Sequence, residues 1–265
     1  MKKMLQPLLV LFVLITLNCN AVTVENPRED IYVSPGSNAK TSFRVINKSD
    51  KEQQMNVYQT DYLFKSDGTN YFDSPGTTPR SNAGWLRFTP KQFTIKPGAR
   101  LNIEVSVSVP NIELSGTYWS VLMVEYVDSE QKVDPQNSNE EMRSSIKVKR
   151  RQGIQIRTHI SGTGDMKARY FNQQVVKKAD KVFFEVDLEN IGTLFYRGNF
   201  WLDIFDEQGQ AVDKVTLSEK SIYPGCSARF SADISGLKNG KYTVLCVYDT
   251  QSNKVFGGKY QIAIP

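Results

Sequence analysis

The stretch RLNIEVSVSVP, residues 100–110, alternates apolar and polar side chains along its whole length. A repeat of two residues places the apolar members on one face of a strand, as in an antiparallel sheet with one buried face. Similar alternation recurs at residues 184–188, 200–204 and 228–234, and no comparably long segment has a helical period. The sequence therefore predicts an all-β protein.

Turn signals divide the chain into two similar units. In each unit a strand ends in asparagine (Asn47, Asn190), and a Pro-Gly pair at 97–98 or 224–225 leads into a later strand. Glycine accepts the positive φ that a type II turn requires after proline. Short strands separated by turns, about seven per unit of roughly 100 to 130 residues, are typical of immunoglobulin-like sandwiches. We therefore predict two tandem immunoglobulin-like β-sandwiches.

The N-terminal 21 residues have the pattern of a secretory signal peptide. Lys2 and Lys3 precede an apolar run, and cleavage after Ala21 fits the small residues at its end. Lipidation of Cys19 is the alternative processing. No other segment is long and apolar enough to span a bilayer, so we expect a periplasmic or secreted mature chain without a membrane span.

The two domains are expected at residues 22–160 and 161–265. The small, glycine-rich segment SGTGD, residues 161–165, marks the boundary. The polar, aromatic-free stretch 128–145 predicts a mobile loop before the last strand of domain one. The core residues expected in domain two are Phe184, Val186, Leu188, Leu202, Ile204, Phe230 and Val244.

Charge and cysteine content limit the possible partners and cross-links. Cleavage of the signal peptide takes two lysines from 33 basic residues and nothing from 28 acidic ones, which leaves a net charge of +3. Nucleic-acid-binding domains usually have a stronger basic excess, so no nucleic-acid partner is expected. Cys226 and Cys246 remain after cleavage, and the sequence leaves open whether they form a disulfide or stay buried free thiols.

Catalytic and cofactor motifs are missing from the sequence. His159 is the only histidine, and it lies in an alternating strand without a serine or cysteine motif that it could activate. The sequence has no glycine-rich phosphate loop, HExxH motif or paired CxxC motif. We therefore expect no enzyme, no cofactor and no metal site, but a binding or structural protein.

The segment KVKRRQGIQIRTHI, residues 147–160, combines five cationic side chains with an alternating pattern. Charge on an exposed edge strand prevents indiscriminate pairing, and the same charges could also bind a partner. Ile154 and Ile156 point to one face and Arg157, with its alternate neighbours, to the other. The simplest interpretation of that second face is a solvated outer surface.

Two exported immunoglobulin-like units, with FTIKPGARLNIEVSV (93–107) and GTYWSVLMVEY (116–126) ahead of a basic strand, resemble the periplasmic pilus-assembly chaperones. A more distant resemblance is to two-domain surface proteins that accompany WxL-domain proteins in Gram-positive bacteria. The chaperone resemblance implies a protein that caps extracytoplasmic pilus or surface subunits by lending them an edge strand, here residues 145–158. The alternative is a structural or adhesive cell-surface component.

The resemblance also implies which residues bind the partner. Arg157 occupies the position of a basic residue that holds the subunit's terminal carboxylate through charge-assisted hydrogen bonds. The family's second basic residue belongs in the first strand, where alignment places Ile31, and Arg28 lies three positions earlier. Arg150 departs from the apolar alternation of a lent strand. The expected partner-binding residues are Arg157, Ile146, Val148, Lys149, Arg150 and Arg28.

Overall fold

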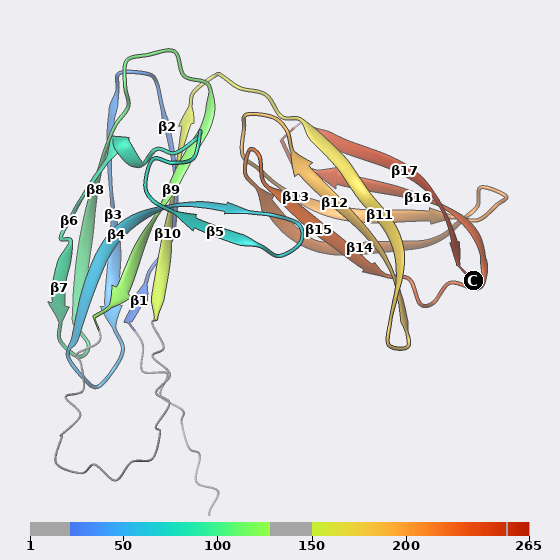
Figure 1. The fold of residues 1–265 in the computed structure, drawn as a ribbon, viewed down its shortest axis with the longest axis horizontal. Coiled ribbons are helices and arrows are strands. Elements are labelled where there is room, and N and C mark those ends of the chain that lie inside the picture. The colour runs from blue at the N-terminus through green and yellow to red at the C-terminus, as the bar shows by residue number, and fades with distance from the viewer. Residues whose placement is uncertain (1–21, 128–149, 253, 265) are drawn as a thin grey trace, which may run out of the picture.

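The computed structural model describes residues 22–127, 150–252 and 254–264. They form two units joined end to end, each made of two facing sheets (Figure 1). The predicted all-β class with two tandem immunoglobulin-like sandwiches is confirmed. Residues 1–21 and 128–149, on which several predictions fall, lie outside the described residues, as do residues 253 and 265.

The first unit contains ten strands of the described chain. They are β1 (Val22–Val24), β2 (Arg28–Val33), β3 (Asn38–Asn47), β4 (Gln53–Phe64), β5 (Asn70–Asp73), β6 (Leu86–Thr89), β7 (Gln92–Ile95), β8 (Arg100–Ser108), β9 (Gly116–Tyr126) and β10 (Arg151–Ile160), with a 3-10 turn, η1 (Ala83–Trp85), before β6. One sheet has the order β1-β3-β8-β6. The other has the order β2-β10-β9-β4-β5, and β7 also pairs with β4.

Alternation along β8 places its apolar side chains between these two sheets. Ile103, Val105 and Val107 are buried in one cluster with Leu122 and Ile154 of the facing sheet. The intervening polar residues of β8 lie toward solvent. The stretch that predicts the fold therefore forms the centre of the first core.

The second unit repeats this arrangement with seven strands. They are β11 (Ala168–Lys178), β12 (Lys181–Asn190), β13 (Tyr196–Phe205), β14 (Ala211–Ile222), β15 (Ser227–Asp233), β16 (Gly240–Asp249) and β17 (Val255–Ile264). The sheets have the orders β11-β12-β15 and β14-β13-β16-β17. Every residue predicted for this core is at most 1% exposed, which confirms that prediction.

A buried asparagine holds the Pro-Gly turn of each unit. The backbone carbonyl of Asn47 accepts the N–H of Gly98, and that of Asn190 accepts the N–H of Gly225, both at 2.8 Å. Each asparagine amide also donates to the carbonyl of the isoleucine two positions before the proline, at 2.9 and 3.0 Å. The two glycines have φ of 70° and 75°, as the predicted turns require. The sequence repeat is therefore a repeat of hydrogen bonds.

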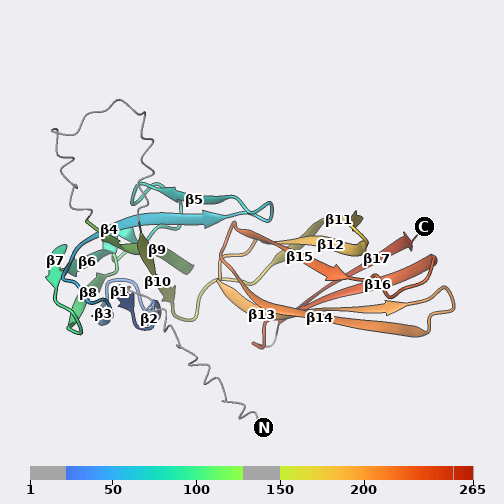
Figure 2. The same cartoon turned by 90° about the horizontal axis from the view of Figure 1, so that it is seen from below.

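The hairpin of β4 and β5 extends from the first unit to the second (Figure 2). In its loop, Lys65 Nζ donates to the carbonyl of Gly225 at 2.7 Å, and the N–H of Ser66 donates to Ser227 Oγ at 2.9 Å. Phe64 packs against the core of the second unit. The hairpin therefore connects the two sandwiches by both polar and apolar contacts.

Strand β9 makes the second connection. Trp119 belongs to the core cluster of the second unit, and its ring lies 4.8 Å from the ring of Tyr223. The N–H of Thr117 donates to the carbonyl of Thr193 at 2.8 Å. These contacts fix the sheet of the first unit that contains β9 against the loops of the second unit.

The two cysteines are separate buried thiols in the second core. Burial raises the pKa of Cys226 to about 11 and that of Cys246 to about 12. Both thiols therefore stay protonated at neutral pH, because an apolar environment disfavours the thiolate. Of the two interpretations left open by the sequence, the structure has the free thiols and not the disulfide.

Candidate partner-binding site

Strand β10 lies between two neighbours for only part of its length. It pairs antiparallel with β9 from Arg151 to Ile160. On its other side it pairs parallel with β2, but only from Gln155 onward. The expected edge strand at 145–158 is thus partly wrong, because β2 covers β10 from Gln155 to its end.

The start of β10 has an open edge. On the β9 side, the carbonyl of Arg150 accepts the main-chain N–H of Tyr126. On the opposite side, the N–H of Gln155 donates to the carbonyl of Pro27. Main-chain groups alternate sides along a strand, so those of Arg151 and Gly153 also point away from β9. No strand of the described chain pairs with them there. The open edge, defined as Arg151–Ile154, therefore has main-chain donors and acceptors that could accept another strand.

The predicted partner residues are distributed unevenly around this edge. Arg150 is exposed directly before β10. Ile146, Val148 and Lys149 lie outside the described residues, so their role stays a prediction. Among the described residues, Arg150 and Arg151 thus form the basic end of the strand.

Arg157 is not on a solvated surface, so that interpretation is wrong. Its side chain is 8% exposed and is paired with Asp30, its register partner on β2. Nη2 donates to Asp30 Oδ2 at 2.7 Å, while Nε lies 2.6 Å from Oδ1 in an ion-pair contact without hydrogen-bond geometry. The guanidinium also lies over the ring of Phe195, 4.3 Å from its centroid. The second unit covers this face, which is why a polar residue is buried there.

Asp30 neutralises the charge of Arg157. Burial alone would raise the pKa of Asp30, but the hydrogen bond from His159 and the positive charge of Arg157 outweigh it, so the pKa lies below its ordinary value. Asp30 is therefore ionised at neutral pH. It is the register partner of Arg157, whereas Ile31, which the resemblance implies for the second basic position, is the partner of Thr158. A carboxylate of this chain is already bound where the resemblance implies that a partner's carboxylate binds.

His159 extends the ion pair to the second unit. Its Nε2 lies 2.8 Å from Asp30 Oδ1, and its Nδ1 lies 3.0 Å from Thr117 Oγ1. Thr117 Oγ1 in turn accepts the N–H of Phe195 at 2.9 Å. A neutral imidazole protonated on Nε2 satisfies the whole chain, because Thr117 can then donate to Nδ1. Asp30, His159 and Thr117 are thus hydrogen-bonded in series, and Thr117 at the end of the series is fully buried.

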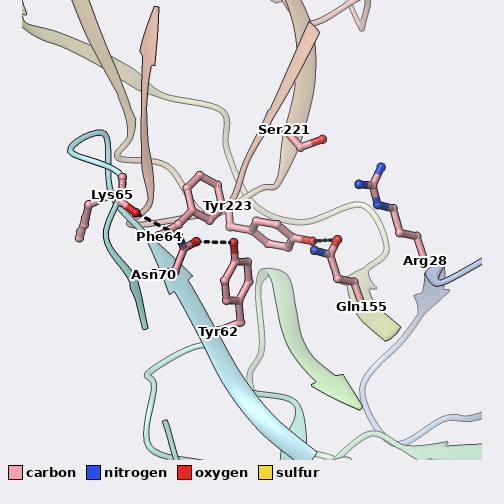
Figure 3. Close-up of a pocket in the computed structure, with 9 residues that line it drawn as sticks. Arg28, Tyr62, Phe64, Lys65, Asn70, Gln155, Ser221 and Tyr223 are labelled. Carbon is pink, nitrogen blue, oxygen red and sulfur yellow. Dashed lines mark hydrogen bonds between the residues drawn. The ribbon is translucent and has the colours of Figure 1, made fainter. Parts of the chain in front are cut away.

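A cavity of about 320 Å³ opens between the two units beside this network (Figure 3). Arg28 and Gln155 contribute from the first unit, Lys65 from the hairpin, and Ser221 and Tyr223 from the second unit. Figure 3 shows the Tyr223 hydroxyl directed at Gln155, to which it donates at 2.9 Å. Burial raises the pKa of Tyr223 to about 12, although Arg157 opposes this, so the hydroxyl remains a donor at neutral pH.

Arg28 is the predicted cation that faces this cavity. It lies opposite Gln155 in the parallel pairing, two positions before Asp30 on the same face of β2. Its side chain is exposed, and no ion pair joins it to any carboxylate of the described residues. The parallel register therefore brings Arg28 to the cleft, as the sequence alignment did not predict.

Sequence reasoning missed Asp30, Lys65 and Tyr223. Asp30 carried a weak signal, since it alternates with Arg28 on a short polar strand. Lys65 and Tyr223 carried none, because each reaches the cleft only through the docking of one unit on the other. The described residues contain no cluster of potential metal ligands. They also contain no helix long and apolar enough to cross a membrane.

Neither a protein-family model nor a curated protein sequence matches the chain. Among solved structures, the class 5 fimbriae chaperone CfaA is 16% identical with a TM-score of 0.46, covering 92% of this chain and 100% of its own. A chain of the complex of CsuC with the tip subunit CsuE from Acinetobacter baumannii is 11% identical with a TM-score of 0.46. The match covers 90% of this chain and 97% of that one. The CupB2 chaperone of Pseudomonas aeruginosa is 10% identical with a TM-score of 0.41, and the match covers 92% of this chain and 100% of its own.

The chain is similar in fold to fimbrial chaperones. At identities of 10% to 16%, with TM-scores of 0.41 to 0.46, the likeness says nothing of particular side chains. What the cleft and the open edge can bind depends on the residues of this chain.

Proposed function

We propose that the protein is a periplasmic chaperone-like protein that binds exported pilus or surface subunits through the open edge of β10. The observation that carries the proposal is the pairing of β10, which leaves the main chain of Arg151–Ile154 without a second pairing strand among the described residues; β1 is bonded there only to the side chain of Gln152. An extended segment can add to such an edge through main-chain hydrogen bonds. Residues 146–149, which precede this edge, are proposed to lengthen the contact.

The cationic anchor of the proposed site is Arg28 rather than Arg157. Arg157 is neutralised by Asp30, whereas Arg28 faces the cavity next to Gln155 and the hydroxyl of Tyr223. The Tyr223 hydroxyl donates to Gln155 Oε1, which leaves the amide N–H groups of Gln155 as neutral donors beside the Arg28 cation, a combination suited to a terminal carboxylate. The open edge and the cavity lie along the same strand, so one partner segment could contact both.

A photo-crosslinking amino acid at position 151, in the protein expressed in its native cells, tests the proposal. We expect it to capture an exported subunit, whereas the same probe at Lys259, on exposed β17, should not. Arg151→Pro and Arg151→Ala form a matched pair, since both remove the guanidinium but only proline removes the main-chain N–H. With the crosslinking probe at position 150, proline should lower capture about three- to tenfold relative to alanine, the effect of one hydrogen bond.

Two results would contradict the proposal. The first is equal capture in the proline and alanine variants, which would mean that the edge accepts no strand. The second is stable display of the protein itself on the cell exterior, which would favour the structural or adhesive alternative.

A further inference from the structure

A second cavity, of about 330 Å³, adjoins the first on the side of the second unit. Phe64, Lys65, Gly68 and Ser221 line both cavities, so the two form one continuous groove. Lys220 extends it along the second unit. Each cavity is at the lower end of the size range of small-ligand pockets. The groove can therefore hold several atoms of a partner in each part.

The lining of this groove has an unbalanced charge. It contains Arg28, Lys65, Lys220 and Arg229, and no aspartate or glutamate lines either cavity. Arg229 is neutralised, because Nε and Nη2 donate to Asp187 at 2.8 and 2.9 Å. The other three cations make no ion pair with a described residue. Three cations of the groove therefore have no counter-ion among the described residues, and a ligand could supply one.

Lys220 is the least solvated of these three cations. Its Nζ donates to the carbonyl of Arg229 and lies 4.9 Å from the centroid of the Phe230 ring. The pKa of Lys220 is lowered, because burial disfavours the ammonium. A carboxylate bound here would offset that loss of solvation.

Asp187, whose negative charge acts on Lys220, does not supply this anion. Its oxygens already accept hydrogen bonds from Nε and Nη2 of Arg229, from Asn172 Nδ2 at 3.1 Å and from Ser66 Oγ at 2.9 Å. Both oxygens are therefore occupied within the protein. Lys220 and Lys65 together with the hydroxyl of Ser221 remain available to a ligand.

We propose that this part of the groove, formed by Lys220, Lys65 and Ser221, is a second carboxylate subsite that binds an acidic side chain of the partner segment. The aromatic rings of Phe64 and Tyr223 lie between it and Arg28, so the favoured occupant has apolar as well as anionic parts. An acidic peptide meets this requirement, whereas a small inorganic anion would contact only the cations. The subsite rests on the proposed function for the source of the peptide, but not on the open edge of β10.

Binding of short peptides to the mature protein tests the subsite. Nine-residue peptides with a free C-terminus carry one glutamate, placed two to six positions before that end, and each has a glutamine counterpart. We expect at least one glutamate peptide to bind roughly tenfold more tightly than its counterpart, as one charge-assisted hydrogen bond would give. Lys220→Gln should abolish this preference, and Lys220→Arg should restore it.

Lys214→Gln is the matched control. Lys214 lies on the same strand and its ammonium is 5.0 Å from the centroid of the Trp201 ring, much as Lys220 lies over Phe230, but it does not line the groove. The control should leave the glutamate preference unchanged. Equal affinity of both peptides throughout the series, or equal displacement of the preferred peptide by inorganic phosphate in wild type and Lys220→Gln, would overturn the subsite.

Chemical labelling in the wild-type protein avoids dependence on the variants. The glutamate peptide should protect Lys220 from acetylation, measured by mass spectrometry, and the glutamine peptide should not. Because Arg151→Pro alters the open edge and not the groove, it should leave this protection intact. In the otherwise unaltered protein, no capture by the probe at position 151 together with protection of Lys220 would reject the edge alone, and capture without protection would reject the subsite alone.

Discussion

Asp30 is the counter-ion of a guanidinium that the second unit covers. Asp30→Asn would leave the nearly buried Arg157 without its anion. Breaking a fully buried pair costs about 3–5 kcal/mol, and we expect about 2 kcal/mol here because water partly screens the 37% exposed carboxylate. Urea unfolding of the mature protein at neutral pH measures this change.

Glu25→Gln is the control for Asp30→Asn. Glu25 pairs with Arg44 at 3.4 Å, but both side chains are exposed, so its loss should cost less than about 0.5 kcal/mol. Equal costs in the two variants would mean that the pair of Asp30 and Arg157 is no stronger than a surface pair. Arg157→Ala should also destabilise the protein, contrary to what a solvated position would predict.

The position of Arg157 explains what residue patterns could and could not predict. Alternation correctly assigns Ile154 and Ile156 to the first core, where both are fully buried. It places Arg157 on the opposite face, but it cannot indicate that Phe195 of another unit covers that face. Burial of a strand's second face depends on domain docking, which leaves no periodic signal in the strand itself.

At the scale of elements, β9 begins at a glycine that the second unit requires. Gly116 has a φ of 78°, and a Cβ there would lie 2.2 Å from the carbonyl oxygen of Thr193. Gly116→Ala therefore combines an unfavourable backbone conformation with a clash between the units. We expect it to lower the free energy of unfolding by more than about 2 kcal/mol and to increase the radius of gyration in solution scattering.

Gly98→Ala separates these two effects. Gly98 has a similar φ of 70°, but nothing lies within 4 Å of a Cβ built there. Its replacement should cost about 1 kcal/mol and leave the scattering profile unchanged. Identical behaviour of the two variants would show that Gly116 does not control the contact between the units.

The strands themselves were largely predictable, whereas their pairing was not. Alternation and the Pro-Gly turns locate β8, β12, β13 and β15, because each directs its apolar side chains into a single core. The parallel pairing of β2 with β10 joins residues about 127 positions apart, such as Asp30 and Arg157. No local pattern encodes that register, so the open edge and the place of Arg28 could only come from the structure.

At the scale of the whole molecule, buried carboxylates link stability to pH. Burial would raise the pKa of Asp187, but hydrogen bonds from Arg229, Asn172 and Ser66 outweigh it and hold the pKa below its ordinary value. A carboxyl group with a lowered pKa stabilises the fold above its ordinary pKa, and this contribution is lost as the pH falls through the folded value.

Asp187→Asn should therefore cost about 2 kcal/mol between pH 5 and pH 7, because it leaves Arg229 only its longer ion pair with Glu185, at 3.9 Å. The difference from wild type should begin to shrink below about pH 4, where Asp187 of the unfolded wild type becomes protonated, and should vanish as the pH falls through the lowered pKa of folded Asp187. Urea unfolding at a series of pH values measures it, with Asp50→Asn at an exposed site as control. A difference that stays constant down to pH 3 would contradict an ionised, internally bonded Asp187.

Strand addition at the open edge of β10 can be tested by hydrogen exchange of individual amides, measured by NMR without and with a captured subunit. The amides of Arg151 and Gly153 have no partner strand among the described residues and should exchange rapidly in the free protein. We expect the subunit to slow their exchange, while the exchange of the Gln155 amide, already bonded to the carbonyl of Pro27, changes little. Unchanged exchange at Arg151 and Gly153 in the saturated complex would contradict strand addition at the open edge of β10.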